Sequence, residues 1–440
     1  MSGKKMMSLF LTMFLMTGIL AACGGGNAAD NTSGNPSGNT SGNTGDTTAS
    51  ENPPAQTGGK VDFWLDKLGD AEKAARLAEA WKNDSGIEIE LTNYPDVAAY
   101  QTAIQQTIDD PGAPGLFTWW SGPQLETLAK NGKLADLTAE WDNYIADGVS
   151  ADIKDAFTVD GKVYAAPYSL RYMSVLYNVE VFEAAGVAVP TTFEEFLEAC
   201  EKIKASGVTP IGLKNDSWAS FIWFQQLIAA YDPQLYIDIC NGTKPYTDEA
   251  VKEVMTIWRD MFNKGYFGEP IVYSDLHKEF ATGVVAMMLD DSPTVTGLQN
   301  DFGMEPGTNV DAFILPSMNG AKGTIFFEAS PIVVTEASSS KEQALAALRG
   351  FYKPGTQTVM VGELGIANIS SISVENGTIQ RILDMTGDSS KYQLLLRFYE
   401  NTPEDLRNTA IDELSRFMYS GADIDDVLNT IQAKADEVFG

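Results

Sequence analysis

The strongest constraint on the fold is the alternation of strand and helix patterns that begins at residue 60. Residues 61–64 form a short, largely apolar strand pattern, and residues 87–91 alternate apolar with acidic side chains, as a half-buried strand does. Apolar side chains recur at helical spacing over residues 74–81 and again over residues 100–108. This alternation predicts a mostly parallel sheet with helices on its faces, which is an α/β fold.

The stretch Leu116–Gly122 places two indoles where the next strand gives way to a helix. Leu116 and Phe117 read as a buried strand, and Pro123 suits the first turn of a helix. At this edge of an open α/β sheet, ligands bind. Adjacent strand residues face opposite ways, so we expect one of Trp119 and Trp120 to be buried and the other to face a cleft. A flat indole with one N–H donor matches the face and hydroxyl rim of a sugar.

Charge and length narrow the class of protein further. The chain carries 60 acidic and 30 basic side chains, which argues against a nucleic-acid partner, because phosphates need a basic surface. Residues 60–440 are too many for one core, so two lobes are expected. After residue 22 we find no apolar stretch long enough to cross a bilayer.

The first 59 residues predict export and a lipid anchor. Lys4-Lys5 precede an apolar run that ends in Leu20-Ala21-Ala22-Cys23, which is typical of a signal peptide. The ending resembles a bacterial lipobox, which implies cleavage before Cys23 and lipidation of its thiol; an ordinary signal with a chance cysteine is the alternative. Residues 24–59 are mostly Gly, Asn, Ser, Thr and Pro and predict a flexible tether.

The remaining reactive side chains give little support to catalysis. Cys200 aligns with apolar residues at helical spacing and reads as a buried thiol, with a Cys200–Cys240 disulfide as the alternative. His277, the chain's single histidine, lies on a helix that we expect to be exposed. We find neither a zinc motif of the His/Cys type nor a glycine-rich phosphate loop. The sequence therefore predicts no enzyme, metal or cofactor, although paired carboxylates of a glycosidase stay open.

From residue 60 onward, the order of several segments resembles the family 1 extracellular solute-binding proteins, the carbohydrate-binding subunits of ABC importers, to which maltose-binding protein is related. The segment Phe280–Met288 is the most characteristic, followed by Tyr246–Asp248. The other matching segments are 116–125, 160–178, 189–211, 246–267, 326–334 and 341–352.

The resemblance implies a two-lobed, periplasmic-binding-protein-like fold with an interlobe cleft and three hinge crossings. The crossings would lie near residues 168–174, 282–284 and 327–331. Residues 1–22 would be the signal peptide and residues 23–59 the lipidated cysteine and tether. The N-lobe would comprise residues 60–169 and 283–328, and the C-lobe residues 170–282 and 329–440.

The family's cleft residues carry over onto aromatic and polar positions of this chain. The candidate ligand-binding residues are Trp64, Asp66, Trp119, Trp120, Ser121, Tyr168, Arg171, Tyr172, Asn215, Trp218, Trp223, Asp290, Asp291 and Glu328. Only one of the adjacent Asp290 and Asp291 can face the cleft. Glu328 lies in an apolar run, where burying a carboxylate without a partner or ligand would be costly. Arg171 either binds sugar or pairs with an acid at the hinge.

Other tryptophans and one departure from the family complete this interpretation. We assign Trp81, Trp141 and Trp258 to packing. Maltose-binding protein carries a tryptophan just after the strand of Asp290, where this chain has Ser292-Pro293-Thr294, so we expect a different ligand or pose.

The resulting prediction is a monomeric, lipid-anchored binding protein on the outer face of a bacterial cell membrane. It would capture a neutral mono- or oligosaccharide and deliver it to ABC-transporter permease subunits. A tethered glycoside hydrolase and a lectin-type adhesin are the alternatives. Which sugar is bound stays open.

Overall fold

The computed structural model describes residues 58–66, 71–145, 149–366, 368, 372 and 374–440. The predicted signal peptide, Cys23 and the tether up to residue 57 lie outside these residues. Among the helices of the described part, none is both long and apolar enough to cross a membrane.

The predicted alternation at the start of the fold is confirmed. Strands β1 (Lys60–Leu65), β2 (Glu88–Asn93) and β3 (Leu116–Thr118) run parallel in the order β2-β1-β3, joined by helices α1 (Ala71–Ser85) and α2 (Val97–Thr107). Helix α1 buries Ala74, Leu77 and Trp81 on one face. Helix α2 begins at Asp96, whose side chain accepts a hydrogen bond from the Ala99 N–H and so satisfies one free donor of the first turn.

Short elements follow β3 and lead into the longest strand. They are α3 (Pro123–Lys130), α4 (Thr138–Glu140), the π-helical turn η1 (Trp141–Ile145), α5 (Ala151–Asp155), and the antiparallel pair β4 (Thr158–Val159) and β5 (Lys162–Val163). Strand β6 (Ala166–Asn178) then runs without interruption through the first predicted crossing.

Residues 179–313 build further strands and helices beside the far end of β6. The strands are β7 (Thr209–Lys214), β8 (Phe267–Ile271), β9 (Val285–Asp291) and β10 (Val310–Phe313). The helices are α6 (Val179–Ala185), α7 (Phe193–Ala205), α8 (Ser217–Tyr231), α9 (Pro233–Cys240), α10 (Glu249–Asn263), α11 (Tyr273–Ala281) and α12 (Ser292–Phe302).

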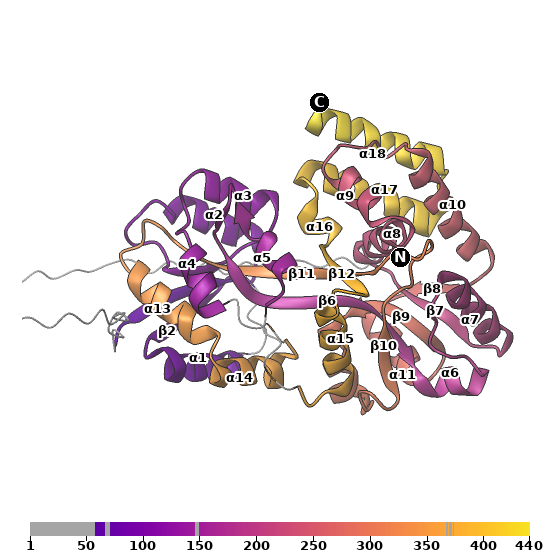
Figure 1. Ribbon diagram of the computed structural model, residues 1–440, viewed down its shortest axis with the longest axis horizontal. Helices are drawn as coiled ribbons and strands as arrows, with labels where there is room; N and C mark the ends of the chain where they lie inside the picture. Colours follow the sequence, from indigo (N-terminus) through magenta and orange to yellow (C-terminus); the bar gives the residue numbers. More distant parts are fainter. Residues whose placement is uncertain (1–57, 67–70, 146–148, 367, 369–371, 373) are drawn as a thin grey trace, which may run out of the picture. The chain divides into compact units, whose positions relative to one another are not determined.

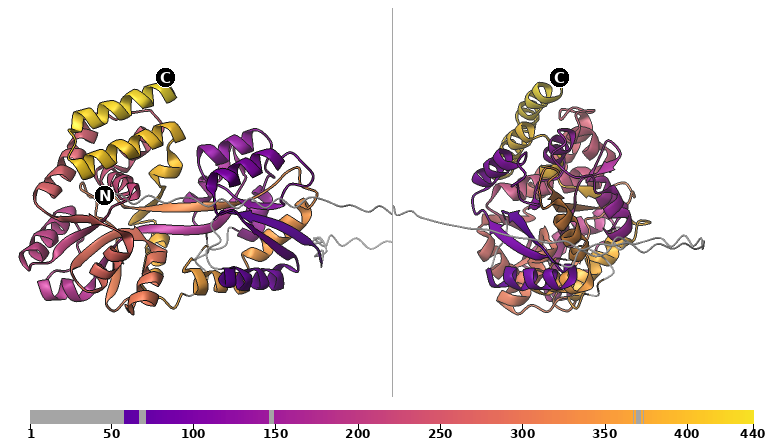
Figure 2. Two further views of the ribbon diagram at one scale, coloured as in Figure 1. Left: turned by 180° about the vertical axis from the view of Figure 1, so that it is seen from behind. Right: turned by 90° about the vertical axis from the view of Figure 1, so that its left-hand side faces the viewer.

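The last part of the chain is mainly helical, as predicted, with one strand within it. After β11 (Gly323–Val334) come α13 (Lys341–Phe351), α14 (Pro354–Leu364), α15 (Gly377–Gly387), β12 (Tyr392–Leu396), α16 (Phe398–Asn401), α17 (Glu404–Ser420) and α18 (Ile424–Phe439). Figure 2 shows α17 and α18, in yellow, packed beside each other.

One ten-stranded sheet connects these parts. Its order is β2-β1-β3-β11-β6-β9-β7-β8, with β10 added to β6 and β12 to β11. Strands β6 and β11 lie side by side along its middle (Figure 1) and are antiparallel. The end of β11 also pairs with β3, and its beginning pairs with β12.

Buried apolar side chains form two core clusters, and strand β9 contributes to both, with Val285 in the first and Met287 in the second. Phe63, Trp81 and Trp141 belong to one cluster, and Trp258 and Phe417 belong to the other. The predicted packing roles of Trp81, Trp141 and Trp258 are confirmed, since each is at most 1 % exposed. Cys200 and Cys240 are both buried and free, so Cys200 is the buried thiol predicted and the alternative disulfide is not formed.

Two elements contact the lobe opposite to the one in which the predicted boundaries place them. Strand β9, which begins just after the predicted second crossing, lies between β6 and β7, because Gly283 only ends α11 and lets the chain return to the same half of the sheet. Helix α13 packs on α1, where Trp81 Nε1 donates to the Ala347 carbonyl at 2.6 Å. These contacts favour placing β9 and β10 with the C-lobe, and α13 and α14 with the N-lobe.

Candidate functional site

The turn between β3 and α3 places the two predicted indoles in different environments. Trp119 is only 7 % exposed and packs edge-to-face on Phe117, while Trp120 is half-buried. Ser121 is buried, and its hydroxyl donates to the Ala329 carbonyl at 2.6 Å. Gly122 has φ 71° and ψ −142°, a conformation that L-residues rarely adopt. The geometry therefore makes Trp120, rather than Trp119, the indole that is available to a ligand.

A pocket of about 200 Å³ opens beside Trp120. One wall consists of Trp120, Ser121 and the start of α3, and the opposite wall consists of Tyr399 and Glu400 of α16. A Cβ on Gly122 would overlap the Glu400 carbonyl, so the glycine permits this close approach. The pocket thus brings the turn between β3 and α3 together with α16.

The end of β1 lies next to the same turn. Trp64 is half-buried and packs on Tyr94, with ring centroids 5.2 Å apart. Asp66 accepts a hydrogen bond from the Thr118 hydroxyl at 3.1 Å. The parallel pairing of β1 with β3 explains why these two predicted residues lie close to the Trp119–Trp120 turn.

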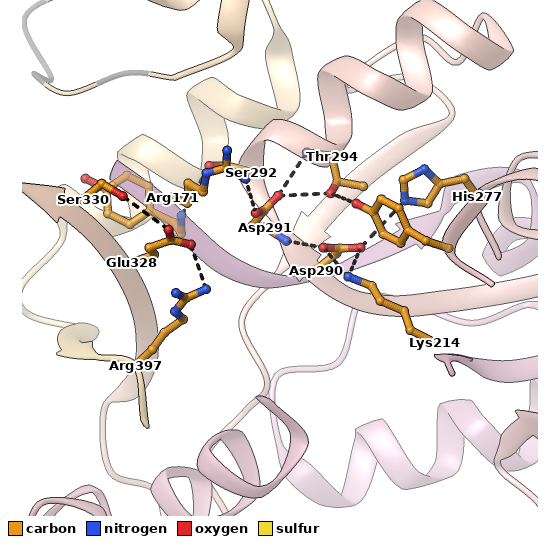
Figure 3. A network of polar contacts seen from close by, with 12 residues as sticks. Arg171, Lys214, His277, Asp290, Asp291, Ser292, Thr294, Glu328, Ser330 and Arg397 are labelled. Carbon is orange, nitrogen blue, oxygen red and sulfur yellow. Dashed lines mark hydrogen bonds and ion pairs between the residues drawn. The ribbon is translucent and has the colours of Figure 1, made fainter. Parts of the chain in front are cut away.

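Strand register brings three of the predicted charged residues together. Glu328 on β11 lies directly opposite Arg171 on β6, so both side chains lie on one face of the sheet. Arg171 donates to Asp291 at the end of β9, with Nη1 3.0 Å from Oδ2. Asp291 also caps α12 by accepting from the Thr294 N–H. Figure 3 shows these side chains converging from three strands.

Glu328 has a buried partner that the sequence analysis missed. The Arg397 guanidinium is 2 % exposed and lies 2.8 Å from Glu328 and 2.5 Å from Glu400. Burial acts to lower the pKa of Arg397, but the two carboxylates outweigh it and raise that pKa above its usual range. Arg397 therefore stays charged. Truncating Arg397 would remove the shared cation from both buried carboxylates, at a cost of about 3–5 kcal/mol.

Asp290 faces a different set of partners from Asp291, as the alternation of strand residues predicts. It is 4 % exposed and accepts from Lys214 Nζ at 3.0 Å. Burial acts to raise the pKa of Asp290, but Lys214 and the neighbouring His277 outweigh it and bring the pKa to about 2. Asp290 is thus an ionised, internally paired carboxylate, whereas the partly exposed Asp291 lines a pocket of about 350 Å³ with Arg171.

The expectation that His277 lies on an exposed helix is wrong. His277 is 7 % exposed on α11, and its ring lies 3.9 Å from that of Tyr273. Its Nε2 is 3.8 Å from Asp290 Oδ2. The helix faces β9 and α12, and this packing covers the imidazole.

Trp218 forms a second aromatic surface. It is 38 % exposed and stacks on Tyr399, with centroids 5.4 Å apart and planes at 15°. The Arg397 guanidinium lies over its ring at 4.8 Å, a favourable cation–π contact. Trp218 thereby joins the Glu328–Arg397 pair to the pocket beside Trp120.

The other predicted residues take different positions. Asn215 is exposed in the loop before α8. Trp223 is buried against Phe267. Tyr168 is buried between Phe63 and Phe351.

Tyr172 is also buried, and it lines a separate pocket of about 410 Å³. It follows Arg171 on β6, so the two side chains lie on opposite faces of the strand. Burial raises the pKa of both Tyr168 and Tyr172. Among the tyrosines and tryptophans predicted to bind ligand, Trp223, Tyr168 and Tyr172 therefore take packing positions.

Two residues of the site were not identified from the sequence, although the sequence pattern around one of them indicates a buried charge. Arg397 follows the apolar run Leu394–Leu396, and the buried-charge argument that singled out Glu328 applies to it equally. Tyr399 carries no such signal, because its role depends on stacking with Trp218.

The assembled side chains suit recognition of a polar, uncharged molecule. Carboxylates accept hydrogen bonds and guanidinium groups donate them. Arg171 is paired with Asp291, and Arg397 with both Glu328 and Glu400, so positive and negative charges lie side by side. Trp120 and Trp218 add flat apolar faces. In the described part of the chain, no group of three or more His, Cys, Asp or Glu side chains is arranged to hold a metal ion.

Comparison with known proteins identifies related sequences. The family model described as "Bacterial extracellular solute-binding protein" matches residues 76–380. An alpha-glucosides-binding periplasmic protein of Rhizobium meliloti is 31% identical over 186 residues, which cover 40% of this chain and 37% of that protein. An osmoprotective compounds-binding protein of Synechocystis is 24% identical over 322 residues, which cover 64% of this chain and 73% of that protein. The match with the first of these relatives thus spans little more than a third of its length.

Solved structures share the fold. A chitin oligosaccharide binding protein superposes with a TM-score of 0.72 at 21% identity, covering 86% of this chain and 98% of that one. The apo form of RafE from Streptococcus pneumoniae gives a TM-score of 0.73 at 18% identity, covering 89% and 100%. The predicted two-lobed solute-binding-protein fold is therefore confirmed.

Proposed function

Because this chain belongs to the family of bacterial extracellular solute-binding proteins, we propose that it is the substrate-binding subunit of an ABC importer and that its cleft captures a neutral sugar or oligosaccharide. The ligand would lie between Trp120 on one side and Trp218 with Tyr399 on the other. The proposed lobes follow the observed contacts, with α13 and α14 in the first and β9 and β10 in the second.

The observation that carries this proposal is the combination of aromatic faces with paired acidic and basic side chains. A sugar presents C–H faces that stack on indoles and hydroxyl groups that both donate and accept. Arg171 with Asp291, and Arg397 with Glu328, supply both functions at 3.0 and 2.8 Å separations. Hydrogen bonds to charged groups contribute roughly 1.5–3 kcal/mol each. An anionic ligand would meet carboxylates here.

The names of several similar proteins support a sugar as the ligand. One relative is named for alpha-glucosides and another is a multiple sugar-binding protein of Streptococcus mutans. One of the similar structures is a raffinose complex. We extend this ligand class to the present chain, together with permease subunits as its partners.

The proposed location rests on the N-terminal sequence. Cys23 would carry the lipid that anchors a monomeric protein to the outer face of the cell membrane, and residues 24–59 would form the tether. Metabolic labelling with a palmitate analogue tests this, with Cys23→Ala as the matched control. Equal labelling of both proteins would contradict lipidation at Cys23.

A thermal-shift screen over neutral mono- and oligosaccharides tests the function itself. A ligand that binds only the folded protein raises the melting temperature, by an amount that grows with its concentration above the dissociation constant. Failure of every sugar at millimolar concentration would contradict the proposal.

We also propose that the protein binds its ligand without converting it. Incubation with the best ligand, followed by assay of new reducing ends, separates binding from glycoside hydrolysis. Products formed over many turnovers would identify an enzyme instead. A charged analogue, such as the matching uronic acid, should bind more weakly than the neutral sugar.

A further inference from the structure

Tyr100 on α2 lies beneath the Trp119–Trp120 turn and is completely buried. Its hydroxyl is 2.5 Å from the Thr118 carbonyl and 3.1 Å from the Trp64 carbonyl. One proton is thus shared between the last residue of β3 and the penultimate residue of β1, as in a three-centre hydrogen bond. Burial raises the pKa of Tyr100 far above its usual value, so the phenol keeps this proton at every physiological pH.

The two carbonyl groups belong to Thr118 and Trp64, at the ends of the two strands that carry the cleft residues of the first lobe. Thr118 directly precedes Trp119 and Trp120, and its hydroxyl donates to Asp66 at 3.1 Å. The Thr118 hydroxyl is also 3.2 Å from that of Tyr100. The Tyr100 phenol therefore sits at the point where the ends of β1 and β3 meet.

The ring of Tyr100 supports the indoles as well. Its centroid lies 6.3 Å from that of Trp119 and 6.2 Å from that of Trp120. It also lies 5.4 Å from that of Tyr94, which packs on Trp64. A single side chain thus touches the backbone of both cleft segments and the two indoles of one of them.

We propose that Tyr100 is a positioning residue for ligand binding, which fixes the direction of the Trp120 indole and its spacing from Asp66 without touching the ligand. This inference rests on the proposed sugar-binding function. A recognition group held in its bound geometry before the ligand arrives loses less entropy on binding. Plain core packing would give the same burial but no effect on Trp120 beyond stability.

Tyr100→Phe tests the inference, because it keeps the ring and removes only the shared hydrogen bond. Tyr266→Phe is the matched control: Tyr266 is also buried, and its hydroxyl donates to Glu201 of α7 at 2.5 Å, beside β7 and β8. Both variants should remain folded, and Tyr266→Phe should lose less thermal stability, because its acceptor Glu201 is exposed. Only Tyr100→Phe should raise the sugar dissociation constant, by about tenfold for a loss near 1.4 kcal/mol, as measured by titration calorimetry.

A readout without ligand keeps the inference separate from the proposed function. In protein labelled with 5-fluorotryptophan, the ¹⁹F resonances of Trp119 and Trp120 can be assigned with Trp→Phe variants. Tyr100→Phe should broaden or split the Trp120 resonance, and Tyr266→Phe should leave it unchanged. If the parent binds no sugar, the proposed function fails, while an altered or unaltered Trp120 resonance still supports or overturns the positioning role.

The remaining outcomes are equally decisive. An unchanged Trp120 resonance in Tyr100→Phe would overturn the inference, as would parental affinity despite a changed resonance. Should Tyr100→Phe fail to fold, Thr118→Val is the second variant. It removes the hydroxyl that links Tyr100 to Asp66 and should weaken sugar binding in the same direction; parental affinity in that variant would also overturn the inference.

Discussion

Replacing each indole of the Trp119–Trp120 pair by alanine should separate a folding role from a binding role. Trp119 is 7 % exposed and lies in the first core cluster, so Trp119→Ala should destabilise the ligand-free protein by about 3–5 kcal/mol. Trp120 is half-buried and loses fewer contacts, so Trp120→Ala should cost clearly less. This difference should appear in urea unfolding of the two variants without ligand.

Affinity should show the opposite order. Loss of a stacked ring costs about 0.5–1.5 kcal/mol beyond area burial, which corresponds to about a 2- to 12-fold weaker sugar complex. The buried face of the indole adds roughly 25 cal/mol per Å². Trp120→Ala should therefore weaken binding in titration calorimetry, whereas Trp119→Ala, assayed where it is folded, should bind nearly as the parent does.

Trp119→Phe is the matched control for this pair. The Trp119 Nε1 donor is buried and finds no acceptor among the described residues, and leaving a buried donor unpaired costs about 1–3 kcal/mol. Phenylalanine removes that donor while keeping a ring, so it should cost much less stability than alanine. If both alanine variants unfold alike and bind as the parent does, the reasoning about this turn is refuted.

Three further perturbations follow from the site. Gly122→Ala should lower the free energy of unfolding by about 1–3 kcal/mol through backbone strain alone, and the added Cβ should displace the Glu400 carbonyl. An unchanged free energy of unfolding in urea would contradict this. The pKa of Asp290 is held near 2, below its value in the unfolded chain, so ionised Asp290 stabilises the fold fully above about pH 4. This contribution falls by about 2 kcal/mol as the pH is lowered to 2. Between pH 5 and pH 2 the free energy of unfolding of the parent should therefore fall by about 2 kcal/mol more than that of Asp290→Asn. Saturating sugar should draw the two lobes together, which small-angle scattering would record as a smaller radius of gyration; an identical radius would count against closure.

Local patterns were sufficient to predict the start of the fold. Alternating side chains and helical spacing located β1, α1, β2, α2 and β3, because each element buries one face against its immediate neighbours. The alternation rule also separated Trp119 from Trp120 and Asp290 from Asp291. The cost of burying an unpaired charge drew attention to Glu328, which is buried and paired with Arg397; its role in ligand binding stays a prediction.

The remainder depends on contacts between distant segments. Arg397 pairs with Glu328 only because β12 joins β11, and a strand of five residues within a helical region leaves a weak signal. His277 is covered by β9 and α12, which its own helix pattern does not reveal. The lobe boundaries stay a prediction, and the contact that bears on them, between α13 and α1, joins segments more than 200 residues apart and leaves no local signal.

The position of β11 between β3 and β6 also governs the order in which the protein can fold. Strand β3 receives its second partner only from residues Ile332–Val334, which are synthesised more than 200 residues later. Until then the first lobe has an open sheet edge and lacks the helix that covers Trp81. Pairings this distant in sequence slow folding, so the nascent N-terminal half should stay incompletely folded until most of the chain has been made.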